Sequence, residues 1–365
     1  MQIVFDFTVL VLGVIISCSF FASGLLWFSN QNKQSNRFLA LLILSVALWL
    51  IDHFLRISEI YRLKPNWYFL PIFYSFAFGP LIYFYVKSLV NQSFIFQKKD
   101  FLHFIPVLCQ AGLYCFLSSR DYEFKNWYWN EIHRPITYRI EFDGTWLSMC
   151  IYLFLSIQLL RKYQVYVNNN FSETSRLKLN WLKIILTILL VLCSQWLVEV
   201  VLREYFSLFF NYDYSIQILG AMALVLAVGG IRQSSLKDVN FAEESPEINA
   251  KTLVQVDETV LQQIQNGMEV QQLYLNPTLT LAEFAKALKL NPKMVSQQIN
   301  TGFKKSFNDF VNEYRVEEVK RRLNSADIER MTILGIAYES GFNSKTTFNR
   351  IFKDFTGVAP REFVK

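Results

Sequence analysis

Long runs of apolar residues fill residues 1–231 of the chain and are absent from the remainder. A helix needs about 20 mostly apolar residues to cross a bilayer, and tilting or long flanking side chains allow somewhat fewer. The runs predict seven membrane spans, near residues 4–28, 38–56, 67–88, 101–118, 143–161, 181–202 and 214–231. The alternative is a large soluble bundle of buried helices, but seven such runs in succession favour lipid.

Charges around these spans predict how the chain crosses the membrane. No Lys or Arg precedes the first span, and Asp6 stands where a signal peptide would be basic, so this span is expected to be an anchor with its N-terminus outside. An odd number of spans then places the C-terminus in the cytoplasm. The loops predicted to be inside carry 11 Lys and Arg residues against 8 in the outside loops, which agrees with the usual cytoplasmic excess of positive charge.

The chain becomes polar after residue 231. Residues 232–257 are rich in serine and acidic residues and are predicted to be a cytoplasmic tether. Residues 258–365 form the second predicted domain, and a helical pattern begins near Asp257. Within it, residues 277–365 hold 15 basic and 10 acidic residues, which is a weak signal for nucleic-acid binding.

Helix signals then define a first helix-turn-helix at about residues 280–300. Thr280 and Glu283 are spaced as a capping box, in which each side chain bonds the backbone amide of the other residue. Asn291 followed by Pro292 marks a second helix start. Two short helices joined by a tight turn, with polar residues facing outward on the second, describe a helix-turn-helix.

The same pattern returns at about residues 332–354, after a longer helix that Ser306 caps and that runs through Leu323. Thr332 is predicted to cap the next helix, and Gly341 to end it in the left-handed conformation. Asn343 is predicted to cap the last helix of this second helix-turn-helix.

Three motifs in the second helix-turn-helix carry a family resemblance. They are I-A-x-x-x-G-F at Ile336–Phe342, S-x-x-x-F-x-R-x-F-K at Ser344–Lys353 and T-G-x-x-P at Thr356–Pro360. Together they make residues from about 275 to 363 similar to the DNA-binding domain of the AraC/XylS family of bacterial transcription regulators. In the first helix-turn-helix the family usually has an Arg where this chain has Gln297, and a Gly where it has Lys304.

The resemblance implies two recognition helices, held by the long connecting helix, that enter successive major-groove segments about 34 Å apart. It also implies a homodimer. Carried over by position, the residues that would contact bases are Lys293, Met294, Gln297, Lys345, Thr346, Asn349 and Arg350. Those better suited to phosphate are Lys304, Lys305 and Lys353. A solvated surface role is the alternative for each of these side chains.

Polar and aromatic groups near the predicted outer ends of the spans are candidates for sensing a signal, because ionisable residues in membrane segments are often functional. The candidates are Asp52, His53, Glu199, Arg203, Trp127 and Trp129. The alternative is structural. Glu199 and Arg203 could pair and reach the surface, and the Trp residues could belong to an interfacial aromatic belt.

Enzyme and cofactor signatures are missing from the sequence. All five cysteines lie in or beside the predicted spans without C-x-x-C spacing, and the three histidines are scattered, so neither a metal site nor a disulfide framework is indicated. The seventh span has no Lys for a retinal-type Schiff base. We therefore expect no cofactor and no enzymatic activity.

The sequence thus predicts an all-α chain in which a seven-helix transmembrane bundle precedes an AraC-type domain. Its predicted function is that of a membrane-tethered, one-component transcription regulator in a bacterial cytoplasmic membrane. Promoter DNA, the lipid bilayer, a second copy of the chain and an unidentified signal ligand would be its partners. One alternative is a receptor or carrier whose C-terminal domain binds protein; another is proteolytic release of that domain.

Overall fold

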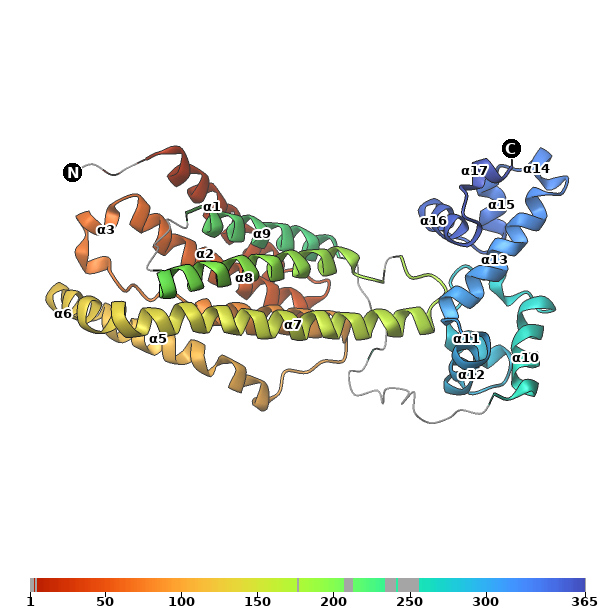
Figure 1. Ribbon diagram of the computed structural model, residues 1–365, viewed down its shortest axis with the longest axis horizontal. Coiled ribbons are helices and arrows are strands. Elements are labelled where there is room, and N and C mark those ends of the chain that lie inside the picture. Colours follow the sequence, from red (N-terminus) through yellow and green to blue (C-terminus); the bar gives the residue numbers. More distant parts are fainter. Residues whose placement is uncertain are drawn as a thin grey trace. The chain divides into compact units, whose positions relative to one another are not determined.

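The structure, a computed structural model, contains helices and no strand in the part of the chain that it describes (Figure 1). That part comprises residues 3, 5–175, 177–206, 213–233, 241 and 256–364, without the side chains at 199, 200, 203, 204 and 213–216. The chain divides into two compact units, which we call the N-terminal unit (residues 1–161 and 180–243) and the C-terminal unit (residues 162–179 and 244–365). Most of the predicted tether, 234–240 and 242–255, lies outside the described residues.

Long apolar helices build the N-terminal unit. They are α1 (Phe7–Trp27), α2 (Lys33–Ile57), α4 (Phe78–Val90), α5 (Ile105–Ser118), α7 (Tyr138–Asn170), α8 (Asn180–Phe206) and α9 (Asp213–Arg232). Short segments connect them: α3 (Ile60–Leu63), η1 (Pro65–Trp67), η2 (Ser75–Ala77), η3 (Lys98–Phe104), α6 (Tyr122–Tyr128) and η4 (Trp129–Thr137). The last residues of α7, from 162 on, belong to the C-terminal unit.

Helix α2 lies at the centre of the N-terminal unit and packs against α1, α4 and α9. Leu39, Ile43 and Leu50 on α2 are fully buried in these contacts. The helices approach closely at Gly220 of α9, where an added Cβ would lie 2.9 Å from side-chain atoms of Ile15 and of Leu50. A larger residue at this position would therefore displace the Ile15 and Leu50 side chains.

Many large apolar side chains of this unit point away from its core. Phe21 on α1, Leu108 on α5 and Phe154 on α7 are 71%, 65% and 63% exposed. So many exposed large apolar side chains are unusual for a soluble protein, whereas a lipid environment would cover them without loss of backbone hydrogen bonds.

Five helical stretches are long and apolar enough to cross a membrane, namely Phe7–Trp27, Lys33–Ile57, Lys98–Ser118, Tyr122–Asn170 and Asn180–Val198. Two shorter apolar helices, Ser75–Val90 and Gln217–Arg232, fall at the third and seventh predicted spans. An apolar helix thus coincides with each predicted span, while the seven-span topology itself stays a prediction.

The third of these helices begins later than its apolar run predicts. The run starts at 67, but α4 starts at Phe78 after the short turn η2. Phe69 has a positive φ of 60°, which a continuing right-handed helix excludes, and Pro71 has no backbone N–H to donate. Phe69 instead buries its ring against Tyr114 and Tyr128.

Shorter helices build the rest of the C-terminal unit. They are α10 (Glu258–Glu269), η5 (Leu273–Leu275), α11 (Leu281–Ala287), α12 (Pro292–Gln298), η6 (Ile299–Phe303), α13 (Phe307–Leu323), α14 (Asp327–Arg330), α15 (Ile333–Glu339), α16 (Lys345–Thr356) and α17 (Pro360–Phe363). Helix α13 belongs to two separate cores. Its N-terminal half packs with α10–α12, and its C-terminal half packs with α15 and α16. It therefore holds the two helix-turn-helix motifs together.

Helix caps in this unit confirm most of the predicted boundaries. The Thr280 hydroxyl accepts from the Glu283 amide at 3.2 Å, and the Glu283 carboxylate accepts from the Thr280 amide at 2.9 Å, so the capping box is present. The caps predicted at Asn291, Ser306 and Thr332 are confirmed as well. The cap predicted at Asn343 is wrong by one residue.

Ser344 is the residue that caps α16, and its side chain accepts from the Thr347 amide. Asn and Ser are about equally good caps. Two such residues in succession therefore leave the helix start undetermined at the level of sequence.

Candidate functional site

The second helix of the second helix-turn-helix, α16, has one buried and one exposed face. Phe348, Ile351 and Phe352 are at most 4% exposed and pack into the core below. The opposite face carries the four side chains predicted to contact bases, all exposed: Lys345, Thr346, Asn349 and Arg350. The structure thus brings these four predicted residues together on one accessible helix face.

Arg350 already has a partner on this helix, because its Nη1 donates to the Asp354 carboxylate at 3.1 Å. Both side chains are more than half exposed, at 53% and 59%. An exposed pair of this kind contributes about 0–1 kcal/mol, so it holds the guanidinium only weakly. Lys353, predicted to contact phosphate, is exposed on the following turn.

The corresponding helix of the first helix-turn-helix, α12, presents less polar surface. Lys293 and Met294 are exposed, but Gln297 is partly buried. Val295 and Ile299 are fully buried on the opposite face. Two of the three predicted base contacts in this motif are therefore accessible, and the third is partly covered.

The two lysines that follow α12 are held in different ways. Lys304 is exposed and has a φ of 55°, a left-handed conformation that favours glycine. Lys305 is partly exposed and forms an ion pair with Glu313 on α13. Lys304 is thus accessible to a phosphate, while Lys305 would first have to leave a carboxylate.

A buried arginine that the sequence reasoning missed lies between the two helix-turn-helix motifs. Arg315 on α13 is 1% exposed. Its Nε donates to the Tyr274 carbonyl at 2.9 Å, and Nη2 donates to the Asn276 carbonyl at 2.7 Å. Nη2 also donates to the Ser172 hydroxyl at 3.1 Å. Arg315 therefore connects α13 to the chain entering the first motif and to residue 172.

Burial lowers the pKa of Arg315 to about 10, and the carboxylate of Glu173 opposes this shift. The guanidinium also lies 6.0 Å from the ring of Phe342 in the second motif. The sequence does contain a signal that Arg315 is buried. This residue lies four residues after Val311 and four before Val319, which places it on the apolar stripe of α13. A charged residue at a core position of a helix marks a candidate buried network.

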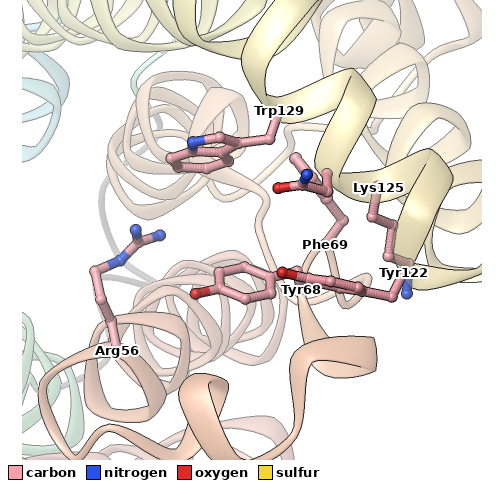
Figure 2. Close-up of a pocket in the computed structure, with 7 residues that line it drawn as sticks. Arg56, Tyr68, Phe69, Tyr122, Lys125 and Trp129 are labelled. Atoms are coloured by element: carbon pink, nitrogen blue, oxygen red, sulfur yellow. The ribbon is translucent and has the colours of Figure 1, made fainter.

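A small cavity lies at the end of the N-terminal unit where Figure 1 shows α3 and α6. Its volume is about 200 Å³, and it is lined by Arg56, Tyr68, Phe69, Tyr122, Lys125, Asn126 and Trp129. Figure 2 shows Arg56 and Lys125 at opposite sides of this space, with the Trp129 ring above it and Tyr68 and Tyr122 below. The lining thus combines two cationic side chains with aromatic rings.

Neighbouring polar groups orient both cations. The Asp52 carboxylate accepts from Arg56 Nη2 at 3.3 Å and from the Tyr61 hydroxyl at 2.5 Å. Lys125 is only 2% exposed, and its Nζ donates to the Asn66 carbonyl at 2.6 Å. Lys125 was not among the predicted sensor residues, and Arg56 ends the same predicted span as the candidates Asp52 and His53. Nothing in the sequence indicates that Arg56 and Lys125, which lie at two different predicted outer loops, line the same cavity.

The predicted sensor residues are distributed unevenly around this cavity. Trp129 lines it, and Asp52 forms an ion pair with Arg56, which also lines it. His53 is buried on α2 and Trp127 is half exposed on α6, and neither lines the cavity. The side chains of Glu199 and Arg203 lie outside the described residues.

Comparison with known proteins identifies the C-terminal region. Residues 284–365 match the family described as "Helix-turn-helix domain". Uncharacterized HTH-type transcriptional regulators from Staphylococcus aureus strains COL, MSSA476 and MW2 are each 30% identical to this chain over 92 residues. The alignments cover 25% of this chain and 12% of each relative. No solved structure matches.

The C-terminal part of the chain is therefore a helix-turn-helix domain of the kind found in DNA-binding transcription regulators. The chain covers only 12% of the length of these relatives, and the family model matches residues 284–365.

Proposed function

We propose that this protein is a membrane-tethered, one-component transcription regulator. Its two helix-turn-helix motifs read double-stranded promoter DNA in the cytoplasm, and its apolar helices anchor it in a bacterial cytoplasmic membrane and respond to a signal. The observation that carries the proposal is one chain that joins five helices of membrane-spanning length to two helix-turn-helix motifs fixed on α13.

DNA reading is supported by the chemistry of the exposed face of α16. Arg350 can give two parallel hydrogen bonds to the guanine edge, and Asn349 can do the same for adenine. Lys304 and Lys353 add positive charge that suits phosphate. Two such faces on one rigid unit would read two successive major-groove segments.

This proposal can be tested by DNA binding. The full-length protein in nanodiscs first selects a duplex from a random library, and the affinity of variants for this selected duplex is then measured. Arg350→Ala should weaken binding to the selected duplex by about 1–3 kcal/mol and relax the preference at one base pair. Arg361→Ala is the matched control, because Arg361 is also exposed but lies on α17, and its binding should match that of the wild type.

The other outcomes of this experiment are equally informative. Equal weakening of Arg350→Ala on selected and random duplexes would assign Arg350 to phosphate. No salt-dependent binding of any duplex by the wild type would reject the DNA-binding proposal. A receptor or carrier whose C-terminal domain binds protein would then be favoured.

Fusions to reporter domains test the proposed topology. Alkaline phosphatase, which is active only outside the cytoplasm, should be active when fused near residue 130 and inactive after residue 365. The reverse result would place the helix-turn-helix domain away from DNA. A blot for a free C-terminal fragment distinguishes tethered action from proteolytic release.

The cavity beside α3 and α6 is the site that we propose for the signal. It has two cationic side chains and no acidic side chain in its lining, so it favours an anionic group. Its aromatic rings suit a flat apolar body. A volume of about 200 Å³ is below the usual range for drug-sized ligands. The expected ligand is therefore a small carboxylate with an unsaturated or ring portion.

A further inference from the structure

The loop between α7 and α8 is fixed to the helix-turn-helix domain by backbone and side-chain contacts. The Ser172 amide donates to the Leu279 carbonyl at 3.1 Å, and Phe171 forms an isolated antiparallel bridge with Thr280. The Asn308 amide group on α13 donates to the Ser172 carbonyl at 2.7 Å. These contacts lie within one compact unit, because residues 162–179 belong to the C-terminal unit. We call residues 171–174 the docked segment.

The surface that receives the docked segment is buried and polar. Asn308, Asn312 and Arg315 on α13 are 6%, 1% and 1% exposed, and all three donate hydrogen bonds to the segment. Ser172 and Thr174 are themselves 1% and 2% exposed. Buried amide and guanidinium groups left without partners would be unfavourable, so this surface is complementary to a polar backbone segment.

The docked segment lies between the two helix-turn-helix motifs. Its partner Thr280 caps α11 of the first motif. Further along the same loop, burial lowers the pKa of Lys178, and the positive charge of Arg350 on α16 adds to this shift. Within the C-terminal unit, Figure 1 shows the yellow-green end of α7 and the loop after it beside α13. The docked segment therefore contacts the first motif directly and reaches the second through Arg315, which lies 6.0 Å from the Phe342 ring.

We propose that the docked segment is an internal competitor of DNA, so that the regulator binds DNA only after this segment leaves α13. This inference rests on the proposed function. A duplex read by both recognition helices must run along the face that α12 and α16 share. The docked segment is held at Thr280 of the first motif and at Arg315, whose guanidinium also lies 6.0 Å from the Phe342 ring of the second motif, so it would obstruct that path.

The position of the docked segment in the chain supplies a route for control. It directly joins α7 to α8, two helices whose apolar stretches are long enough to cross a membrane. A change in the packing of α7 or α8 would therefore pull on residues 171–174 through the chain itself, and no further contact between these helices and the helix-turn-helix motifs would be needed. DNA and docking would then exclude each other, and each would weaken the other by the same factor.

Ser172→Trp tests the competition, because an indole cannot replace a hydroxyl that is 1% exposed. The full-length protein in nanodiscs is titrated against a labelled random-sequence duplex, since the operator is unknown. If nine in ten wild-type molecules are docked, release should tighten binding about tenfold. Ser175→Trp is the matched control, because Ser175 is exposed on the same loop, and its affinity should equal that of the wild type.

Hydrogen exchange on the same samples shows whether the variant is undocked and still folded. The Ser172 amide should lose protection in Ser172→Trp while the amides of α13 keep theirs. In the wild type, saturating duplex should also reduce protection of the Ser172 amide. Equal or weaker DNA binding by an undocked, folded Ser172→Trp would overturn the inference. If neither the wild type nor this variant binds DNA, the proposed function fails instead.

Discussion

Gly341 offers the sharpest test of how the two helix-turn-helix motifs are held together. It has a φ of 94°, and a Cβ added there would lie 2.3 Å from the Tyr274 carbonyl oxygen and 2.9 Å from Arg315 Nε. The first atom belongs to the backbone, which cannot move aside cheaply. Gly357 is a matched control, because it has a φ of 80° but no atom within 4 Å of the added Cβ.

The two Gly→Ala substitutions share one cost and differ in another. Holding alanine in a left-handed conformation costs about 1–2 kcal/mol at either position. At Gly341 the added methyl group must also displace the Tyr274 backbone or the Arg315 side chain, and overpacking of this kind costs about 1–3 kcal/mol. We therefore expect Gly341→Ala to lower the stability of the C-terminal unit by about 2–5 kcal/mol and Gly357→Ala by about 1–2 kcal/mol.

Native-state hydrogen exchange of the full-length protein measures these losses, since it reports opening free energies region by region. The amides of α15 and α16 are the ones to follow. The two sites share no neighbours, so their losses of stability should differ only through the contacts that each added methyl group makes. Losses for Gly341→Ala and Gly357→Ala that agree within about 0.5 kcal/mol would therefore refute the reasoning. The junction around Arg315 would then be looser than the described contacts imply.

Two further results are expected. Lys304→Gly should stabilise the first helix-turn-helix by up to about 1 kcal/mol because it removes a left-handed lysine, and unchanged hydrogen exchange of the amides of α12 would contradict this. In isothermal calorimetry, benzoate should bind the wild-type protein, whereas neutral benzyl alcohol should bind more weakly and Lys125→Met should bind no benzoate. Equal binding of the two compounds would remove the anion preference proposed for the cavity.

Local signals in the sequence predict much of the helix-turn-helix domain. The capping box of Thr280 and Glu283 and the cap at Ser306 depend only on residues within one turn, so the sequence contains all the information needed. The exposed face of α16 follows equally from the spacing of its buried phenylalanines. The start of α16 could not be fixed to the residue, because Asn343 and Ser344 are both good caps.

Contacts between distant parts of the chain left no such signal. Arg315 meets Ser172 across 143 positions, and Lys125 meets Asn66 across 59. Neither residue 172 nor residue 125 differs in its local pattern from ordinary loop and helix residues. The cavity and the docked segment are products of such contacts, and they appear only when the fold is known.

Helix α13 has a consequence for the DNA that this regulator would accept. Its 17 residues span about 25 Å, and each half is built into the core of one motif. Two domains on a flexible linker tolerate extra base pairs between their subsites, but a continuous helix does not lengthen. A half-turn insertion between the two subsites should abolish recognition, and a full-turn insertion, which restores the facing of the grooves, should fail to rescue it. Operators would then keep one invariant spacing while their bases diverge.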